Sequence, residues 1–159
     1  MGAPRFGWDA VPLAYPLDTM RLPAAWDDLV DGTALSVGNP HVVFFVSDAD
    51  AVDLARLGSL VEHDALFPER VNVGVAQLTG PSAIRLRVWE RGAGLTRACG
   101  TGACAAAVAG IARRLVAGPV EVTLPGGALR IDWAPGEGIR MAGPATHVFT
   151  GEAHWSAFS

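Results

Sequence analysis

The clearest hydrophobic pattern in the chain is a continuous apolar run at residues 41–46, which follows turn-forming residues at 38–40. An apolar run of this length without polar alternation predicts a strand that is buried on both faces. Further along, apolar residues alternate with polar or small residues at 71–75 and at 84–88. This period of two predicts a pair of half-buried strands around a turn at 80–81.

A short helix is predicted at residues 52–61, because its apolar residues recur three and four positions apart. These apolar positions are Leu54, Leu57, Leu60 and Val61. Asp48 or Asp50 is expected to cap the helix, since an aspartate side chain accepts hydrogen bonds from the first free backbone N–H groups.

A second helix is predicted at residues 101–115, which are nearly all Ala, Val, Ile and Leu until Arg113 and Arg114. A helix that is apolar on every side must be surrounded by protein, and arginines at its C-terminal end complement the helix dipole. Further strands are expected at 120–124, 129–133, 139–142 and 147–150. Prolines interrupt residues 1–35, so only short extended pieces are expected there. The predicted fold is α/β of the α+β type, a curved, mainly antiparallel sheet wrapped around one central buried helix.

The length of 159 residues predicts one domain, 1–159, because single cores commonly reach roughly 150 residues. Half of the residues are hydrophobic and 18% are charged, as is typical of a folded protein and not of a disordered one. The net charge of −4 and the pI near 5.5 leave no basic face for nucleic acid. All 12 basic residues are Arg, so the chain has no lysine for a pyridoxal phosphate Schiff base or a P-loop.

The longest apolar runs, at 42–46 and 103–112, are much shorter than the ~20 residues that a bilayer span needs, and no signal-peptide pattern opens the chain. The two cysteines, Cys99 and Cys104, are too few for a disulfide scaffold or a zinc finger. We therefore expect a cytoplasmic protein that binds neither membranes nor nucleic acid.

The segment most informative about chemistry is 89–104, where a strand and a glycine-rich loop lead into the N-terminus of the buried helix. Cys99 stands at this helix start and is followed by Gly100, Thr101 and Gly102. Free N–H groups and the positive end of the dipole favour a thiolate there, so we predict a lowered pKa for Cys99. The same N–H groups would hold a carboxylate, and the glycines remove Cβ atoms that would keep a ligand from the backbone.

Structural interpretations stand beside this catalytic one. Cys99 would then be a small buried residue before a turn. Cys104 points elsewhere on the helix and is expected to pack in the core. The pattern Gly-x-Gly-x-x-Ala at 100–105, with Glu121 further on, also fits a relaxed dinucleotide-binding fingerprint. In that fold the first glycine follows its strand almost at once, whereas here the preceding strand ends much earlier.

Other polar residues offer the groups that a zwitterionic amino acid needs. Asn39 supplies an amide donor and acceptor, and His41 is expected near the thiolate, where it would tune the cysteine pKa. Asn72 places an amide on the polar face of a predicted strand. Glu90 and Arg91, between a strand and a glycine loop, would pair with an ammonium and a carboxylate. The structural alternatives are a plain turn, a solvated amide and a surface ion pair.

At these residues the sequence resembles the diaminopimelate epimerase family, whose members interconvert L,L- and meso-diaminopimelate in lysine and peptidoglycan-precursor synthesis. The resemblance covers nearly the whole chain. It rests on the segments Gly38-Asn39-Pro40-His41, Phe67-Pro68-Glu69-Arg70-x-Asn72, Glu90-Arg91-Gly92-x-Gly94 and Ala98-Cys99-Gly100-Thr101-Gly102-Ala103-Cys104.

The resemblance implies that Cys99 is one of two catalytic acid/base cysteines, with His41 and Glu90 modulating the cysteine pKa. It implies that the substrate contacts are Asn39, Asn72, Glu90, Arg91, Gly100 and Thr101. The family's reaction uses no cofactor and no metal. Each of its two lobes wraps a sheet around a central helix, and the substrate lies between the two helix N-termini.

This chain resembles only the second, C-terminal lobe. Inverting a stereocentre with two bases needs a thiolate on one face of the α-carbon and a thiol on the other. An N-terminal lobe or a partner chain, with a homodimer as one possibility, must therefore supply the second cysteine. A proline-racemase-like or phenazine-isomerase-like lobe is the alternative among enzymes, and a catalytically silent single-lobe binding domain is the alternative outside them.

Overall fold

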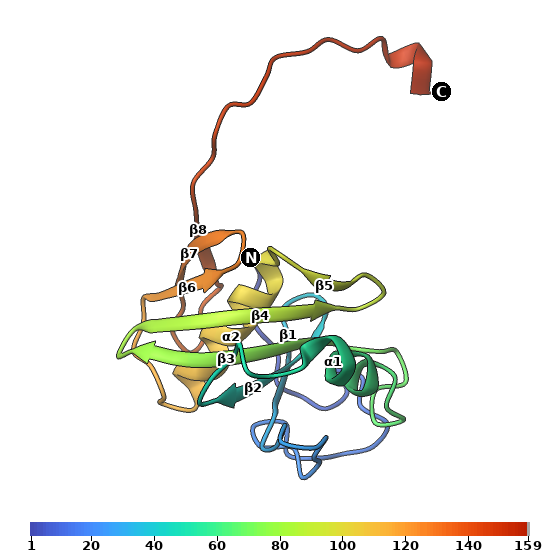
Figure 1. Cartoon of the computed structure of the whole chain (residues 1–159), viewed down its shortest axis with the longest axis vertical. Coiled ribbons are helices and arrows are strands. Elements are labelled where there is room, and N and C mark those ends of the chain that lie inside the picture. The colour runs from blue at the N-terminus through green and yellow to red at the C-terminus, as the bar shows by residue number, and fades with distance from the viewer. Residues whose placement is uncertain (159) are drawn as a thin grey trace.

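Strands from the whole length of the chain join in one curled sheet, in the order β1-β2-β3-β4-β6-β7-β8 with β5 paired to β4 (Figure 1). The structure is a computed structural model that describes residues 1–158. The strands are β1 (Thr33–Ser36), β2 (Pro40–Val46), β3 (Asn72–Gly80), β4 (Ala83–Glu90), β5 (Gly94–Thr96), β6 (Val120–Leu124), β7 (Gly127–Asp132) and β8 (Arg140–Ala142). The helices are α1 (Leu54–Glu62), α2 (Gly100–Ala112) and the short 3-10 helix η1 (Trp155–Phe158).

The sheet is mainly antiparallel, as predicted. Among the described strands, β2 pairs with β3 and β4 pairs with β6 in parallel, and the other neighbours are antiparallel. Parallel neighbours need a long crossover connection, which is usually a helix. Here α1 lies in the connection from β2 to β3, and α2 lies in the connection from β4 to β6.

Helix α2 is the hydrophobic centre of the fold, which confirms the predicted buried helix. It contacts β1, β2, β3, β4, β6 and β7, and every residue from Gly102 to Gly110 is buried. The helix ends at Ala112, earlier than predicted, and Arg114 is left-handed with a φ of 59°. The guanidinium of Arg113 pairs with Asp31 at 2.5 Å. Arg113 therefore ties the helix end to the N-terminal segment, a role that the predicted interaction with the dipole did not include.

A second layer, formed by α1 and the N-terminal segment, covers the other side of the sheet (Figure 1). Residues 72–76 of β3 are all buried, because helices contact this strand from both sides; the prediction of a half-buried strand is wrong. The cap of α1 also differs from the prediction. Asp53, and neither Asp48 nor Asp50, accepts the hydrogen bond from the backbone nitrogen of Arg56.

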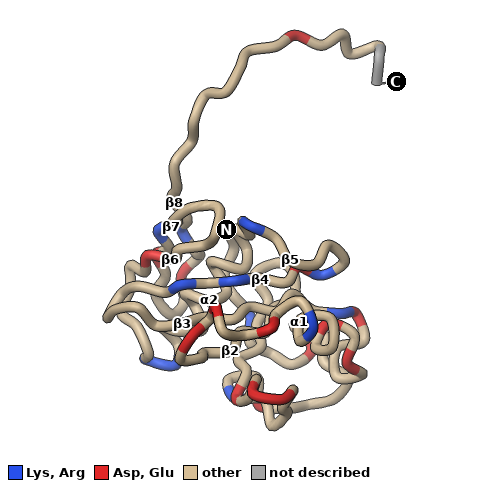
Figure 2. Tube along the Cα trace, in the orientation of Figure 1, with Lys and Arg blue, Asp and Glu red and all other residues tan. Residues whose placement is uncertain are grey.

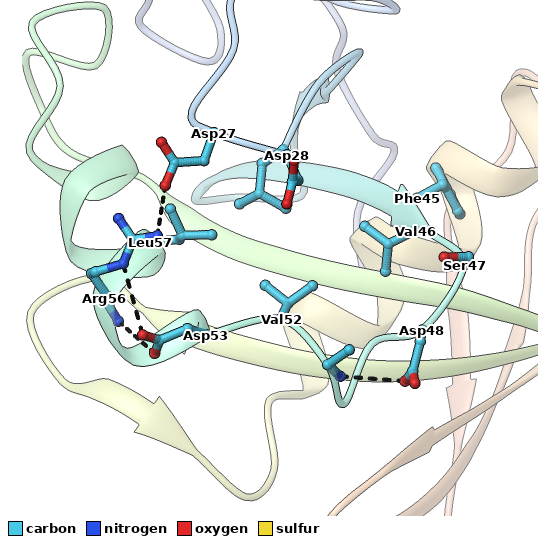
Figure 3. A pocket seen from close by; sticks show the side chains of 12 residues that line it. Asp27, Asp28, Phe45, Val46, Ser47, Asp48, Val52, Asp53, Arg56 and Leu57 are labelled. Carbon is cyan, nitrogen blue, oxygen red and sulfur yellow. Dashed lines mark hydrogen bonds and ion pairs between the residues drawn. The ribbon is translucent and has the colours of Figure 1, made fainter.

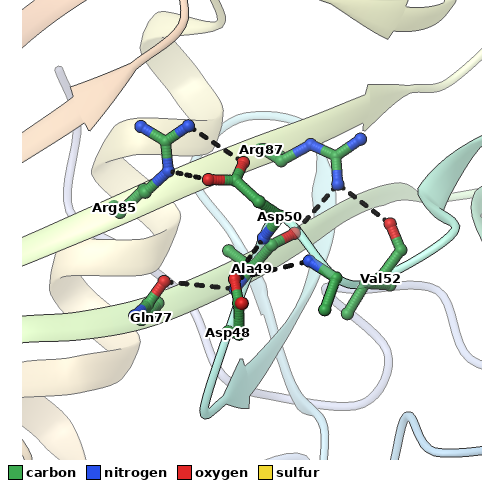
Figure 4. A network of polar contacts seen from close by, with 8 residues as sticks. Asp48, Ala49, Asp50, Val52, Gln77, Arg85 and Arg87 are labelled. Carbon is green, nitrogen blue, oxygen red and sulfur yellow. Dashed lines mark hydrogen bonds and ion pairs between the residues drawn. The ribbon is translucent and has the colours of Figure 1, made fainter.

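The loop between β2 and α1 is fastened to the outer face of β4 by two arginines, as Figure 4 shows. Arg85 pairs with both carboxylate oxygens of Asp50, at 2.8 and 2.9 Å. Arg87 donates to the carbonyl oxygens of Ala49 and Val52, both at 2.9 Å. The polar residues that alternate with the buried ones on β4 thus hold this loop in place.

The C-terminal residues leave the body of the protein as an extended tail (Figure 1). Residues 147–150 lie outside the described strands, so the prediction of a strand there is wrong. Val148, Phe149 and Trp155 are each more than 80% exposed, at 84%, 81% and 85%. Acidic and basic residues intermingle over the body, whereas Glu152 is the one charged side chain after residue 142 (Figure 2). No helix within residues 1–158 is both long and apolar enough to cross a bilayer.

Candidate active site

Cys99 occupies the N-cap position of α2. Its backbone is extended, with φ of −147° and ψ of 102°, and its Sγ accepts a hydrogen bond from the backbone nitrogen of Gly102 at 3.3 Å. The hydroxyl of Thr101 lies 3.5 Å from the same sulfur. The thiol therefore takes up one of the free N–H groups at the helix start, where the sequence places it.

The two glycines beside Thr101 differ in their surroundings. A Cβ on Gly102 would lie 3.1 Å from Sγ of Cys99 and 3.0 Å from Cγ2 of Val88. The missing side chain of Gly102 thus makes room for the thiol. That it also lets a ligand approach the backbone stays a prediction. A Cβ on Gly100 would meet Sδ of Met141 at 3.3 Å, and this methionine is a partly exposed, flexible side chain.

The environment of Cys99 raises the pKa of its thiol, which is opposite to the predicted direction. Burial is the largest cause; the hydrogen bonds from Thr101 and Gly102 act in the lowering direction, and the charge of Glu90 raises the pKa again. The hydrogen bonds from Thr101 and Gly102 do not outweigh the loss of solvent and the nearby carboxylate. Cys104 is buried in the core as predicted, and burial raises its pKa to about 11.

His41 is linked to the cysteine through two intervening side chains. Its Nε2 lies 3.1 Å from Oδ1 of Asn39, and Nδ2 of Asn39 donates to the Thr101 hydroxyl at 3.5 Å. His41 is 1% exposed, and burial together with the charge of Arg91 lowers its pKa to about 3. The ring is therefore neutral near pH 7, and because Nε2 faces an amide oxygen, Nε2 carries the proton. The expected proximity of His41 to the thiol is an indirect one.

Asn72 joins three strands at the same end of the sheet. It lies opposite His41 in the register of β2 and β3. Its Nδ2 donates to the carbonyl of Pro40 at 2.8 Å, and its Oδ1 accepts from the backbone nitrogen of Arg91 at 3.0 Å. Asn72 is only 4% exposed, so the alternative of a solvated amide is wrong.

Glu90 and Arg91 lie at the end of β4 and point to different partners. Glu90 accepts a hydrogen bond from the hydroxyl of Thr96 at 2.6 Å, across the pairing of β4 with β5. The guanidinium of Arg91 donates to the carbonyl of Glu69 at 3.0 Å. In the described part of the chain, the two side chains form no ion pair with each other.

The structure thus brings the predicted residues to one place, the N-terminal end of α2 and the strand ends beside it. One series of contacts runs from His41 through Asn39 and Thr101 to Cys99. A second joins Asn72 to Arg91. Among the described residues, no group of three or more His, Cys, Asp or Glu side chains is arranged to hold a metal ion.

A cavity of about 170 Å³ lies beside Cys99 and Gly100, with Leu124, Leu129 and Pro144 among its lining residues. A larger one of about 510 Å³ lies elsewhere, between the end of β2 and the start of α1 (Figure 3). Its rim is acidic, and Arg56 there pairs with Asp27 and Asp53. None of the predicted site residues lines this larger cavity. Cys99 and Gly100 are the two predicted site residues that line the smaller one.

Two polar residues that support the site were not predicted from the sequence. Thr96 lies on β5, a strand too short for a recognisable pattern. Glu62 ends α1 and accepts hydrogen bonds from Trp89 and from the backbone of Gly92. The burial of Glu62 could have been predicted from the sequence. It lies eight residues after Leu54 and therefore on the same, buried face of the helix.

Comparison with known proteins gives matches to one family. The sequence model of the family described as "Diaminopimelate epimerase" matches residues 33–148. The chain is 58% identical over 159 residues to the diaminopimelate epimerase of Zymomonas mobilis, 63% identical over 158 residues to that of Rhizorhabdus wittichii, and 61% identical over 158 residues to that of Sphingopyxis alaskensis. These alignments cover 99–100% of this chain but only 58–59% of each relative. The chain therefore spans less than two thirds of the length of the relatives it matches.

Proposed function

Since the chain belongs to the diaminopimelate epimerase family, we propose that residues 1–159 form one lobe of an enzyme that interconverts L,L- and meso-diaminopimelate in lysine biosynthesis. The reaction removes the α-proton from one face of the substrate and returns a proton to the other face. We assign Cys99 to one face and a cysteine outside this chain to the opposite face. No cofactor takes part in these steps.

The observation that supports this proposal is the position of the Cys99 sulfur at the N-cap of α2, beside a cavity of about 170 Å³. The free N–H groups of the first helical turn favour a substrate carboxylate next to the sulfur. As the α-proton leaves, negative charge spreads onto that carboxylate, and the same fixed dipoles stabilise it. Gly100 and Thr101 supply these backbone contacts in our proposal.

The raised pKa of Cys99 favours its thiol form, which donates a proton. In that direction the S–H bond of Cys99 breaks and a C–H bond forms on one face of the α-carbon. The opposing thiolate takes the departing proton from the other face. Cys99 is then the thiolate and its counterpart the thiol, so the reverse reaction starts from the opposite protonation states.

Glu90 and His41 modulate this chemistry in different ways. The carboxylate of Glu90 raises the pKa of Cys99, and a substrate ammonium bound to Glu90 would offset that charge and favour the thiolate. His41, neutral and buried, acts through Asn39, whose amide it orients. Asn39 and the exposed guanidinium of Arg91 then contact the amino-acid groups of the substrate. Asn72 contributes through its links to Pro40 and Arg91.

The second cysteine comes, in our proposal, from an N-terminal lobe or a partner chain. The tail after residue 142 supports the presence of a second protein surface. Its side chains Val148, Phe149 and Trp155 are exposed, and the tail extends away from the body (Figure 1). Large apolar side chains gain free energy when another surface covers them. A homodimer is one way to supply that surface. Cys99 and Cys104 are both free thiols, which agrees with a reducing cytoplasm as the proposed compartment.

The test is incubation of L,L-diaminopimelate in D₂O with the chain alone and with a separately produced N-terminal lobe of the Zymomonas mobilis relative. Chiral analysis and deuterium content of the recovered substrate are the measurements. The chain alone is expected to give no inversion, and the mixture is expected to give deuterated meso-diaminopimelate. The Cys99→Ser variant should abolish that product.

Inversion by the chain alone would show that a dimer builds a complete site. A mixture with Cys99→Ser that remains as active as the parent mixture would contradict the role of Cys99. Lobes that associate and bind diaminopimelate without inverting it would identify the chain as a silent binding domain.

A further inference from the structure

The turn that follows β4 is held by two buried side-chain acceptors on successive backbone N–H groups. Oδ1 of Asn72 accepts from Arg91 at 3.0 Å, and Oε1 of Glu62 accepts from Gly92 at 2.9 Å. A backbone hydrogen bond from Ala93 to Glu90 at 3.0 Å closes the same turn. The turn presents Glu90 and Arg91, so whatever fixes it also fixes those two side chains.

Glu62 is a buried carboxylate whose two oxygens are both engaged. It ends α1, on the side of the sheet away from α2, and is 2% exposed. Oε2 accepts from the indole nitrogen of Trp89 at 2.7 Å, and a guanidinium nitrogen of Arg70 lies 3.8 Å from Oε1. Burial acts to raise the pKa of Glu62, but the hydrogen bonds of Trp89 and Gly92 and the charges of His63 and Arg70 give a net lowering. The carboxylate is therefore charged at neutral pH.

Trp89 connects this carboxylate to the hairpin of β4 and β5. Its side chain lies directly against α1, because a Cβ on Gly58 would come within 2.5 Å of the indole Cγ. On the hairpin side, a Cβ on Gly94 would lie 3.5 Å from the indole ring. The indole is thus packed between helix and hairpin, and the charge-assisted hydrogen bond to Glu62 sets its orientation.

We propose that Glu62 is a positioning residue, which holds the turn at residues 90–93 so that Glu90 and Arg91 face the ligand with a fixed geometry. Helix α1, which lies outside the site, thereby controls the residues that bind the amino-acid groups. The identity of the ligand rests on the proposed function. The hydrogen-bond arrangement at Glu62 does not depend on it.

The test is Glu62→Gln, with the exposed Glu121→Gln on β6 as a matched control. Trp89 and Gly92 donate to different oxygens of Glu62. A glutamine replaces one of these oxygens by an NH₂ group, so in the present geometry one of the two N–H donors faces another donor. In ¹⁵N-labelled protein, the amide resonances of Arg91, Gly92 and Ala93 and the indole resonance of Trp89 should shift in Glu62→Gln only. Titration with meso-diaminopimelate should show affinity weaker by about tenfold, the loss expected for one charge-assisted hydrogen bond.

A second variant separates positioning from loss of stability. In Glu62→Gln/Trp89→Phe the competing indole donor is gone, so the glutamine oxygen is free to accept from Gly92, and the 91–93 amide resonances should return toward the parent positions. In the reconstituted two-lobe enzyme, Glu62→Gln should raise KM more than it lowers kcat. A lower melting temperature with unchanged amide resonances and unchanged affinity would overturn the proposal.

The unmodified chain provides a measurement that needs no variant. Acidification that protonates Glu62 should move the Gly92 amide and Trp89 indole resonances together, in a single transition. His63 and Arg70 are the charged groups that face Glu62. Independent titration of the two resonances would overturn the proposal. If the chain mixed with the N-terminal lobe neither binds nor inverts diaminopimelate, the proposed function fails, whereas these resonances still decide the role of Glu62.

Discussion

The sulfur of Cys99 accepts a hydrogen bond from the backbone nitrogen of Gly102 at 3.3 Å. This bond satisfies a free N–H group of the first helical turn and holds the sulfur at the positive end of the helix dipole. Because Gly102 lacks a Cβ, the sulfur lies closer to the helix than any other residue would permit. The thiol is nevertheless less acidic than usual, since it is buried and Glu90 is near.

Removal of the Glu90 charge is expected to lower the pKa of Cys99. Alkylation by iodoacetamide, followed at the Cys99 peptide by mass spectrometry, should have its pH midpoint above the usual thiol value of about 8.5 in the parent. In Glu90→Gln the midpoint should move to lower pH, and in Glu121→Gln it should stay unchanged. A parent midpoint below 8.5 would mean that the dipole dominates after all.

Cys99→Ser is expected to leave the fold intact. A serine hydroxyl is a preferred N-cap acceptor of similar size, so the free energy of unfolding should change by no more than about 1 kcal/mol. Cys99→Ala loses the acceptor and should be less stable than Cys99→Ser by about 1 kcal/mol. Urea unfolding curves of both variants measure the difference. A Cys99→Ser protein that does not fold would make Cys99 a structural residue.

Ala106→Asp is expected to abolish folding. Ala106 lies on α2 with no exposed surface, and an unpaired carboxylate there costs several kcal/mol against a typical total stability of about 5 to 15 kcal/mol. Ala145→Asp, in the exposed tail, is the control and should melt like the parent. Thermal melts followed by circular dichroism compare them; a normal melt for Ala106→Asp would mean that this helix face is not packed.

His41 is expected to make the protein acid-sensitive. Its pKa is about 3 when folded and 6.5 when exposed, so the unfolded chain binds more protons in that interval. The stability that the neutral ring contributes is therefore present above pH 6.5 and is lost as the pH falls toward 3, by several kcal/mol at about 1.4 kcal/mol per pKa unit.

Urea unfolding at pH 7, 5 and 4 measures this loss, and His41→Gln should reduce its steepness. His147→Gln, in the exposed tail, is the matched control and should follow the parent. Glu62 also makes the folded state less stable as the pH falls below 4.5, its ordinary pKa, because its pKa is lowered in the fold. An acid dependence that is the same in His41→Gln and the parent would contradict a buried neutral His41.

Periodicity in the sequence was sufficient to predict the helices and strands that are buried either on one face or on all sides. The apolar run at 41–46, the alternation at 84–88 and the uniform apolarity of α2 each correspond to an element of the structure. The pattern failed where a second layer changes burial. Residues 72–76 are covered on both sides although Asn72 and Gly74 read as outward positions.

The strand predicted at 147–150 shows another limit of local pattern. Its residues favour an extended backbone, but a strand is completed only by hydrogen bonds to a neighbour. In the described chain these residues lie in an exposed tail without such a neighbour. Local propensity therefore predicts the backbone shape and not the pairing.

The sequence by itself determined which residues gather at the site, because the cysteine at the start of an apolar helix and the polar residues at strand ends are readable without coordinates. The tertiary structure alone decided their electrostatics. Whether the pKa of Cys99 rises or falls depends on the competition between burial, the Glu90 charge and the helix N–H groups, and burial is set by residues distant in the chain. The pKa of His41 is likewise set by the tertiary structure, since burial and the charge of Arg91 keep the ring neutral. The charge of Glu62 depends on hydrogen-bond donors at Trp89 and Gly92, which are distant from it in the sequence. Such effects depend on distances in space, which spacing along the chain does not contain.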